Sequence, residues 1–283
     1  MSQWLNEVIE SASATSDFLA PVRKQSLSSL EQMGWPGRRN EAWRFTPLSS
    51  LEKRSVKTAS DVTAQQAPDI EGLDAVELVF VDGKLTADTS ELALPQGVTV
   101  AAFDQLDAEQ QDVVKSLYGQ VKPERHVFGL VNDVATEQGI FIDVAPGVTL
   151  EKIIRVTNLV TQDVDAHTRI VVRIGEGASA RIFEHAEGQA SSMSTAFAEY
   201  AIGDEAHLEH YRFAMMTGEA KQVGGSHFKL GNASTLNSTV VGYGSELSRL
   251  DVDIIHAGEH ANAKMNAVYL LAEGELFDLH SNI

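Results

Sequence analysis

Five glycines at nearly equal spacing constrain the fold of this chain more than any other feature. Gly147, Gly175, Gly203, Gly231 and Gly258 follow one another at intervals of 28, 28, 28 and 27 residues, and each one separates two short apolar runs. A fixed period of this length indicates a supersecondary unit that is stacked on copies of itself. The chain is therefore predicted to contain a solenoid.

Positions at a fixed offset from these glycines share their character. The positions three residues and one residue before them are apolar: Val144, Val172, Tyr200, Phe228 and Ile255, and Pro146, Ile174, Ile202, Leu230 and Ala257. After the last four glycines, an apolar position (Ala180, Leu208, Leu236, Ala263) precedes a polar one (Arg181, Glu209, Asn237, Lys264). This is the inside and outside alternation of a strand.

A second turn divides each unit. Gly188, Gly218, Gly244 and Gly274 fall between the first set of glycines, so each unit reads as strand, turn, strand and turn. Residues 168–174, 197–202 and 251–255 are rich in β-branched and aromatic side chains, which favour strands over helices. The predicted fold is mainly β, an incomplete right-handed parallel β-helix whose coils stack at about 4.8 Å.

The chain before the solenoid divides into three stretches. Residues 1–50 are predicted to be a short helical region, with start signals at 16–17 and Pro21 and a stop at 34–37. Residues 51–75 are a polar linker, suited to an exposed connection. Residues 76–137 are a small mixed α/β connector with a strand at 76–81, a tight turn at 82–83, a strand at 97–100 and a helix at 107–118. The coils are assigned to residues 138–283.

Composition excludes several classes of function. Forty acidic and 22 basic residues give a formal net charge of −18, and no basic cluster exceeds the Arg38–Arg39 pair. Nucleic acid and anionic membranes need a basic face, so neither is an expected partner. The chain has no cysteine, which excludes disulfides, thiolate catalysis and ligation of metal by its own sulfur. The start of the chain lacks a signal peptide, and a cytoplasmic protein is expected.

One run before the linker carries a resemblance to a known family. It reads Pro36-Gly37-Arg38-Arg39-Asn40-Glu41-Ala42-Trp43-Arg44-Phe45-Thr46-Pro47-Leu48. It resembles the Arg-x-x-Glu-x-Trp-Arg-Tyr-Thr-x-Leu signature of the SufB/SufD family of iron–sulfur cluster assembly proteins, with SufD the better match because SufB has a longer and different amino-terminal region. Three further runs are similar to that family in the same order: 81–84, 130–142 and Phe277-Asp278-Leu279-His280. The matched signature residues are Arg38, Glu41, Trp43, Arg44, Phe45, Thr46, Asp278 and His280.

The resemblance implies a non-catalytic scaffold. In that family, SufD pairs with SufB through their β-helices, and each binds the ATPase SufC through a carboxy-terminal helical segment. The chain stops at Ile283 inside an expected coil, and the family's late Cys-x-His-Gly stretch is missing, so a truncated chain with an open, self-pairing end is expected. No cofactor is expected on this segment, since the iron–sulfur cluster would be assembled by the whole complex.

The simplest role of the signature is structural. Trp43 and Phe45 are expected to anchor the amino-terminal segment, with Arg44 and Glu41 as a local ion pair. The alternative is a binding surface, because exposed aromatic and arginine side chains are also typical of interfaces.

The histidines are weak candidates for metal binding. His207 and His210 are three residues apart in an expected strand and so face opposite ways. His207 is expected to face outward with Glu151, Ser179, Thr235 and Asn262, and His210 to lie in the core with Ile154, Ile182 and Met265. His256 and His260 flank a turn and, with Glu259, are the only candidates for a cation. A solvated turn is the favoured interpretation.

Enzymatic functions find little support. The pattern Gly-x-x-x-x-Gly-Lys and the Gly-x-Ser-x-Gly elbow are both absent from the sequence, so ATP hydrolysis would come from a partner. No catalytic residue is assigned, and a cofactor-binding residue is unknown. Two alternatives stay open: a carbohydrate-active β-helix enzyme, whose long groove would hold paired carboxylates, and a purely structural solenoid without SufB and SufC as partners.

Overall fold

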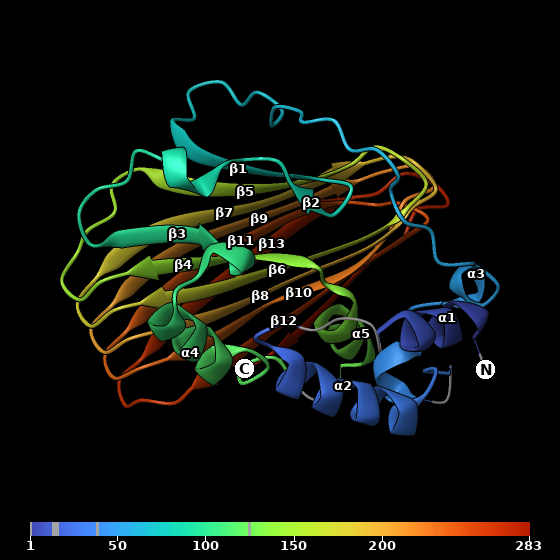
Figure 1. The fold of residues 1–283 in the computed structure, drawn as a ribbon, viewed down its shortest axis with the longest axis horizontal. Coiled ribbons are helices and arrows are strands. Elements are labelled where there is room, and N and C mark those ends of the chain that lie inside the picture. Colours follow the sequence, from blue (N-terminus) through green and yellow to red (C-terminus); the bar gives the residue numbers. More distant parts are fainter. Residues whose placement is uncertain (1, 13–16, 38–39, 124–125) are drawn as a thin grey trace.

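Two seven-stranded sheets dominate the computed structural model, which describes residues 2–12, 17–37, 40–123 and 126–283. Sheet A has the strand order β13-β11-β9-β7-β5-β1-β2, and sheet B has the order β14-β12-β10-β8-β6-β4-β3. The strands of the repeats are β4 (Gln138–Val144), β5 (Ile153–Val160), β6 (Asp165–Ile174), β7 (Ser179–Gly188), β8 (Met193–Ile202), β9 (His207–Met216), β10 (Lys221–Leu230), β11 (Thr235–Tyr243), β12 (Leu247–His256), β13 (Asn262–Leu270) and β14 (Phe277–Asn282). Figure 1 shows the sheets stacked as two layers.

Consecutive strands alternate between the two sheets, and strands two apart pair in parallel. Ser179 pairs with His207 and His207 with Thr235, which places partners 28 residues apart. The predicted fold class is confirmed: the chain is mainly β and forms a β-solenoid of about five turns, preceded by helices.

The first and last glycines of the series do not mark the register that the sequence suggested. Val144 pairs with Ile174 rather than Val172, and the Gly147 N–H donates to the Glu176 carbonyl, so the first coil is two residues longer. At the other end, Phe228 pairs with Ile254, which leaves Ile255 facing outward and 41% exposed. The prediction of a buried apolar position at Ile255 was therefore wrong.

The space between the sheets, called the lumen below, holds the main hydrophobic core. The alternation along β9 places Leu208, His210 and Arg212 inward, while His207 faces partly outward. His210 is 1% exposed, and it pairs in register with Ile182, which confirms the opposite orientations of the two histidines. In the His207 column, the residue that bridges to Ser179 is Thr149 rather than the expected Glu151.

The predicted helical region is confirmed and lies against sheet B. Helices α1 (Gln3–Ala12) and α2 (Ala20–Met33) pack with a helix that the sequence did not predict, α5 (Val127–Ala135). Figure 1 shows these helices on the sheet B side, and α5 contacts β6, β8 and β10. Trp4, Phe128 and Phe197 share one buried cluster there. Ser16, a predicted start signal, lies outside the described residues.

A buried ionic layer joins the helical region to sheet B. Arg169 contacts Asp133 of α5 and Glu199 of β8, and Lys122 Nζ lies 3.1 Å from Asp133. Glu199 also accepts hydrogen bonds from the N–H groups of Gly119, Val121 and Lys122. Burial raises the pKa of Glu199, but the charges of Arg169 and Lys122 outweigh it and hold that pKa below its usual range.

The predicted connector contributes strands to the solenoid. Strand β1 (Ala75–Val81) pairs with β5 of sheet A and turns through Asp82 and Gly83, both at positive φ, into β2 (Lys84–Leu85). Strand β3 (Val98–Ala102) pairs antiparallel with β4 of sheet B. The predicted helix is α4 (Ala108–Leu117), capped by Asp107. The sheets thus continue across the boundary that was placed between residues 137 and 138.

Short helices complete the fold: α3 (Ser49–Glu52) and the 3-10 turns η1 (Glu41–Trp43), η2 (Thr89–Glu91) and η3 (Phe103–Gln105). Residues 53–74 run as an extended, mostly exposed segment from α3 to β1. In the described ranges, no helix is long and apolar enough to cross a membrane.

Candidate functional site

The amino-terminal signature forms a short turn whose side chains divide between core and surface. Asn40 caps η1 by accepting a hydrogen bond from the Ala42 N–H at 3.2 Å. Trp43 is 3% exposed and Thr46 2% exposed, whereas Phe45 is 72% exposed. Trp43 therefore anchors the segment as predicted, and the prediction that Phe45 does so was wrong, because the 3-10 turn directs the two rings to opposite sides.

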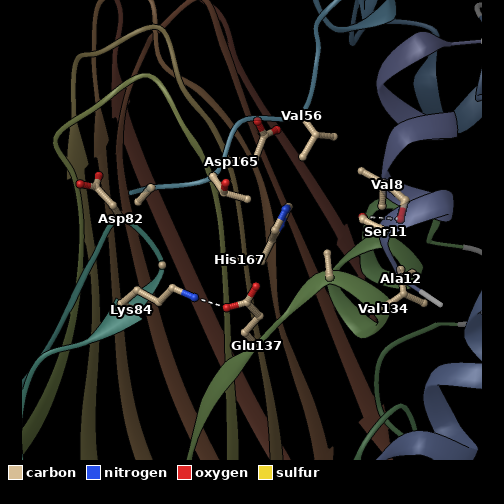
Figure 2. Close-up of a pocket in the computed structure, with 14 residues that line it drawn as sticks. Val8, Ser11, Ala12, Val56, Asp82, Lys84, Val134, Glu137, Asp165 and His167 are labelled. Atoms are coloured by element: carbon tan, nitrogen blue, oxygen red, sulfur yellow. Dashed lines mark hydrogen bonds and ion pairs between the residues drawn. The ribbon is translucent and has the colours of Figure 1, made fainter. Parts of the chain in front are cut away.

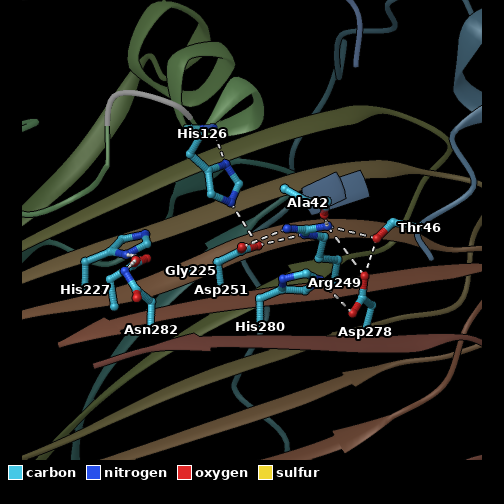
Figure 3. Close-up of polar contacts among 12 residues, drawn as sticks. Ala42, Thr46, His126, Gly225, His227, Arg249, Asp251, Asp278, His280 and Asn282 are labelled. Carbon is cyan, nitrogen blue, oxygen red and sulfur yellow. Dashed lines mark hydrogen bonds and ion pairs between the residues drawn. The ribbon is translucent and has the colours of Figure 1, made fainter. Parts of the chain in front are cut away.

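The signature and the Asp-x-His run meet on one arginine. Arg249 of β12 pairs in register with Asp278 of β14, and its guanidinium lies 3.9 Å from the centre of the Trp43 ring. Arg249 Nη1 donates to the Ala42 carbonyl and, at 2.9 Å, to the Thr46 hydroxyl, which in turn donates to Asp278. Figure 3 shows these groups converging between the turn and the last two strands of sheet B. Two motifs that are far apart in the sequence thus form one cluster.

Asp251 joins this arginine to the start of α5. It accepts hydrogen bonds from Arg249 Nε and Nη2, both at 2.9 Å, and its Oδ2 lies 2.9 Å from His126 Nε2. His126 Nδ1 accepts the Gly129 N–H at 3.1 Å as the cap of α5, so the proton of the neutral imidazole lies on Nε2. Burial raises the pKa of Asp251, but His126 and Arg249 outweigh it and hold that pKa well below its usual range.

A pocket of about 170 Å³ opens beside these groups. His227 Nδ1 lies 2.9 Å from Asp253 Oδ2, and Asn282 donates to the other Asp253 oxygen at 3.2 Å. His280, at the mouth of the pocket, lies 3.1 Å from Asp278. The pocket is lined by Asn40, Ala42, Trp43, Pro123, His126, Arg249, Asp251, Val252, Asp253, His280, Ser281 and Asn282.

The remaining predicted site residues lie apart from this pocket or show other contacts. Arg38 lies outside the described residues. In the described ranges, no ion pair joins Glu41 to Arg44; Arg44 lies over the exposed Phe45 ring at 5.5 Å instead, so that predicted pair is absent. His256 and His260 are both exposed beside their turn. In the part of the chain that the structure describes, no group of three or more His, Asp or Glu residues is arranged to hold a metal ion.

The cluster is chemically suited to holding segments together and to binding a polar partner at its rim. Asp251 and Asp278 both contact Arg249 and a histidine, and Asp253 contacts a histidine and an amide. Sequence reasoning missed Arg249, Asp251 and His126. The alternation Arg249-x-Asp251-x-Asp253 was a readable signal of a polar outward face, but nothing in the sequence placed His126 above it.

A second pocket, of about 130 Å³, lies where α1, the extended segment and the start of β6 meet (Figure 2). Asp165 secures this junction, because it accepts hydrogen bonds from Trp4 Nε1 at 2.6 Å and from the Lys57 N–H at 2.8 Å. His167 Nδ1 lies 2.8 Å from the Thr195 hydroxyl, and burial lowers the pKa of His167. These contacts connect the amino-terminal helix to the solenoid.

The depressed pKa of Asp251 predicts an acid-dependent contribution to stability. A group whose pKa is lower in the folded than in the unfolded state stabilises the fold above its unfolded pKa, about 3.9, and loses that effect as the pH falls below it. Asp251→Asn is therefore expected to destabilise by about 1–3 kcal/mol at pH 7, with the difference from wild type shrinking between about pH 5 and pH 3. Urea unfolding at each pH measures it. Asp104→Asn, at an exposed carboxyl, is the control, and a difference that stays constant with pH contradicts the assignment.

Comparison with known proteins gives matches over nearly the whole chain. The model of the SufBD protein N-terminal region matches residues 4–156, and that of the SUF system FeS cluster assembly SufBD core domain matches residues 157–283. An iron–sulfur cluster assembly SufBD family protein of Synechocystis is 23% identical over 96% of this chain and 64% of its own length. Iron–sulfur cluster assembly protein SufD of Escherichia coli K12 is 24% identical over 92% of this chain and 61% of its own.

A chloroplast protein of Arabidopsis thaliana, ABCI7, is 21% identical over 100% of this chain and 62% of its own length. The chain thus spans less than two thirds of each of these relatives. The two matched regions correspond to the two parts of the fold, the helical region with its connector and the solenoid. The resemblance seen in the signature is confirmed, and the chain belongs to the SufBD family of the SUF system for iron–sulfur cluster assembly.

Proposed function

We propose that this chain acts in the cytoplasm as a non-catalytic scaffold of iron–sulfur cluster assembly, in the manner of SufD, and that its complete form pairs with SufB and recruits the ATPase SufC. The observation that carries the proposal is the match of both SufBD regions across residues 4–283. The geometry agrees with a scaffold, because the charged groups of the candidate site are engaged with one another and secure the amino-terminal turn to the last coils.

Co-purification tests this proposal. The complete reading frame, expressed with SufB and SufC from the same genome, is expected to give a stable complex that contains all three proteins. The subunit alone is expected to hydrolyse neither ATP nor polysaccharides such as polygalacturonate. If SufB and SufC are both absent from the purified material, the scaffold assignment fails, and polysaccharide cleavage by the lone subunit would favour the carbohydrate-active alternative.

A further inference from the structure

The outer face of sheet A, which points away from the lumen, is covered differently from that of sheet B. Figure 1 shows the helices on the sheet B side, while an extended segment passes along sheet A beside β1. Val62 and Ala67 of this segment pack on Val79, Val81 and Leu159. This face is thus covered over β1 and β5 by an extended stretch of polypeptide, and not by a helix.

A groove follows this segment on its other side. Two hollows of about 680 Å³ each lie end to end along it, over strands β7 and β9. The first lies between Gln65, Gln66 and Pro68 and a floor that includes His185, Met215 and Tyr243. The second lies between Ile70 and Leu73 and a floor of Phe183, Tyr211 and Phe213. The floor residues alternate along β7 and β9, so the groove runs in the strand direction.

The floor is aromatic and uncharged. The Phe183 ring lies 4.7 Å from that of Phe213 and 5.6 Å from that of His185. Burial and the nearby Arg155 lower the pKa of His185 to about 4, so this ring is neutral at pH 7. The apolar surface continues by register onto the next two strands, where Val268 is 59% and Leu270 65% exposed. A contiguous apolar surface of this kind marks an interaction site.

The wall of the groove favours an extended occupant. Within the described residues, the backbone N–H and C=O groups of 62–69 make no hydrogen bond with other backbone groups. An extended chain with unpaired backbone groups beside an apolar floor is the arrangement that binds a further strand, with backbone pairing for affinity and alternate side chains for specificity.

Charge selects among possible strands. The rim and the segment carry the carboxylates Asp69, Glu71, Asp74, Glu151, Glu187 and Glu209, against the cations Lys152 and Arg181. A second copy of this chain, with its net charge of −18, would be repelled. We propose that this groove binds an extended segment of a partner protein, about six residues long, with apolar side chains at alternate positions and basic residues at its ends.

A defined peptide tests the groove. The probe is a fluorescein-labelled peptide in which valine alternates with threonine, flanked by two lysines at each end, and its binding is followed by fluorescence anisotropy. Met215→Glu, in the floor, is expected to weaken binding at least tenfold. Thr239→Glu, a matched charge on the outer face of β11 but outside both hollows, is expected to leave it nearly unchanged. Tyr243→Glu, at the more exposed edge of the floor, provides a second variant whose folding is less at risk.

Hydrogen exchange distinguishes strand pairing from other modes of binding. The amides of residues 62–69 are expected to exchange at least tenfold more slowly in the peptide complex. The proposal is overturned if the probe does not bind saturably up to millimolar concentration, if the Met215 and Thr239 variants weaken it equally, or if it binds without protecting these amides. The groove is remote from the Arg249 cluster in sequence and lies on the other sheet, so its failure would leave the SufB and SufC test unaffected.

Discussion

Replacing Arg212 by alanine is expected to lower the free energy of unfolding by about 3–5 kcal/mol, because it leaves a buried carboxylate without its cation. Arg212 lies in the lumen, 2% exposed, and its Nη1 donates to Glu184 Oε2 at 2.6 Å. Glu184 is itself 3% exposed. Burial raises the pKa of Glu184, but Arg212 and His210 outweigh it and lower that pKa to about 2, so the carboxylate stays charged.

The network around this pair spans both sheets. Glu184 Oε1 accepts hydrogen bonds from Tyr200 at 2.8 Å and Ser226 at 2.7 Å, and lies 2.8 Å from His210 Nε2. Arg212 Nη2 donates to the Ala196 carbonyl at 3.0 Å, and Gly224 makes room for it, since a Cβ there would lie 2.7 Å from that nitrogen. Strands β7, β8, β9 and β10 each contribute to the network, which favours one register of the coils.

Urea unfolding of Arg212→Ala and of the double variant Glu184→Gln with Arg212→Met separates charge from packing. The double variant removes both charges while keeping similar volumes, so it is expected to recover most of the stability lost in the single variant. A loss below 1 kcal/mol for Arg212→Ala, or a double variant as unstable as the single one, would show that the pair is not the source of the effect.

The 28-residue period predicted more of the structure than its glycines did. It predicted the coils, the alternation along the strands and the opposite faces of His207 and His210. It also places Glu184 and Arg212, which pair directly in the register of β7 and β9, in one inward column. Two opposite charges in such a column are a readable signal of a lumen ion pair. The period failed at Gly147 and Ile255, because the first and last coils differ in length by one or two residues.

The candidate site was only half predictable. The two motifs could be recognised from the residues, but their contact through Arg249 depends on how a 3-10 turn outside the repeats lies against β12. No period relates these segments. For the same reason Trp43 and Phe45, two residues apart in the signature, could not be assigned to core and surface from their type alone.

The same difference makes Trp43 and Phe45 a matched pair for mutation. Trp43→Ala is expected to destabilise the protein by about 3–5 kcal/mol, because it empties a buried ring site and uncovers the Arg249 guanidinium. The Trp43 ring also lies 5.1 Å from that of Phe128 on α5, so its removal loosens the helical region as well. Phe45→Ala, at a side chain that is 72% exposed, is expected to change stability by less than about 0.5 kcal/mol.

Thermal or urea unfolding of the two variants decides which role the signature has. Trp43→Phe is expected to retain part of the stability that Trp43→Ala loses, since a smaller ring still covers Arg249. If Phe45→Ala instead proves the more damaging change, the turn must lie with its other side against the coils, and the cluster around Arg249 would have to be redrawn. If only Trp43→Ala is damaging, the signature stabilises the attachment of the helical region to the solenoid, and Phe45 with Arg44 is left free to contact a partner.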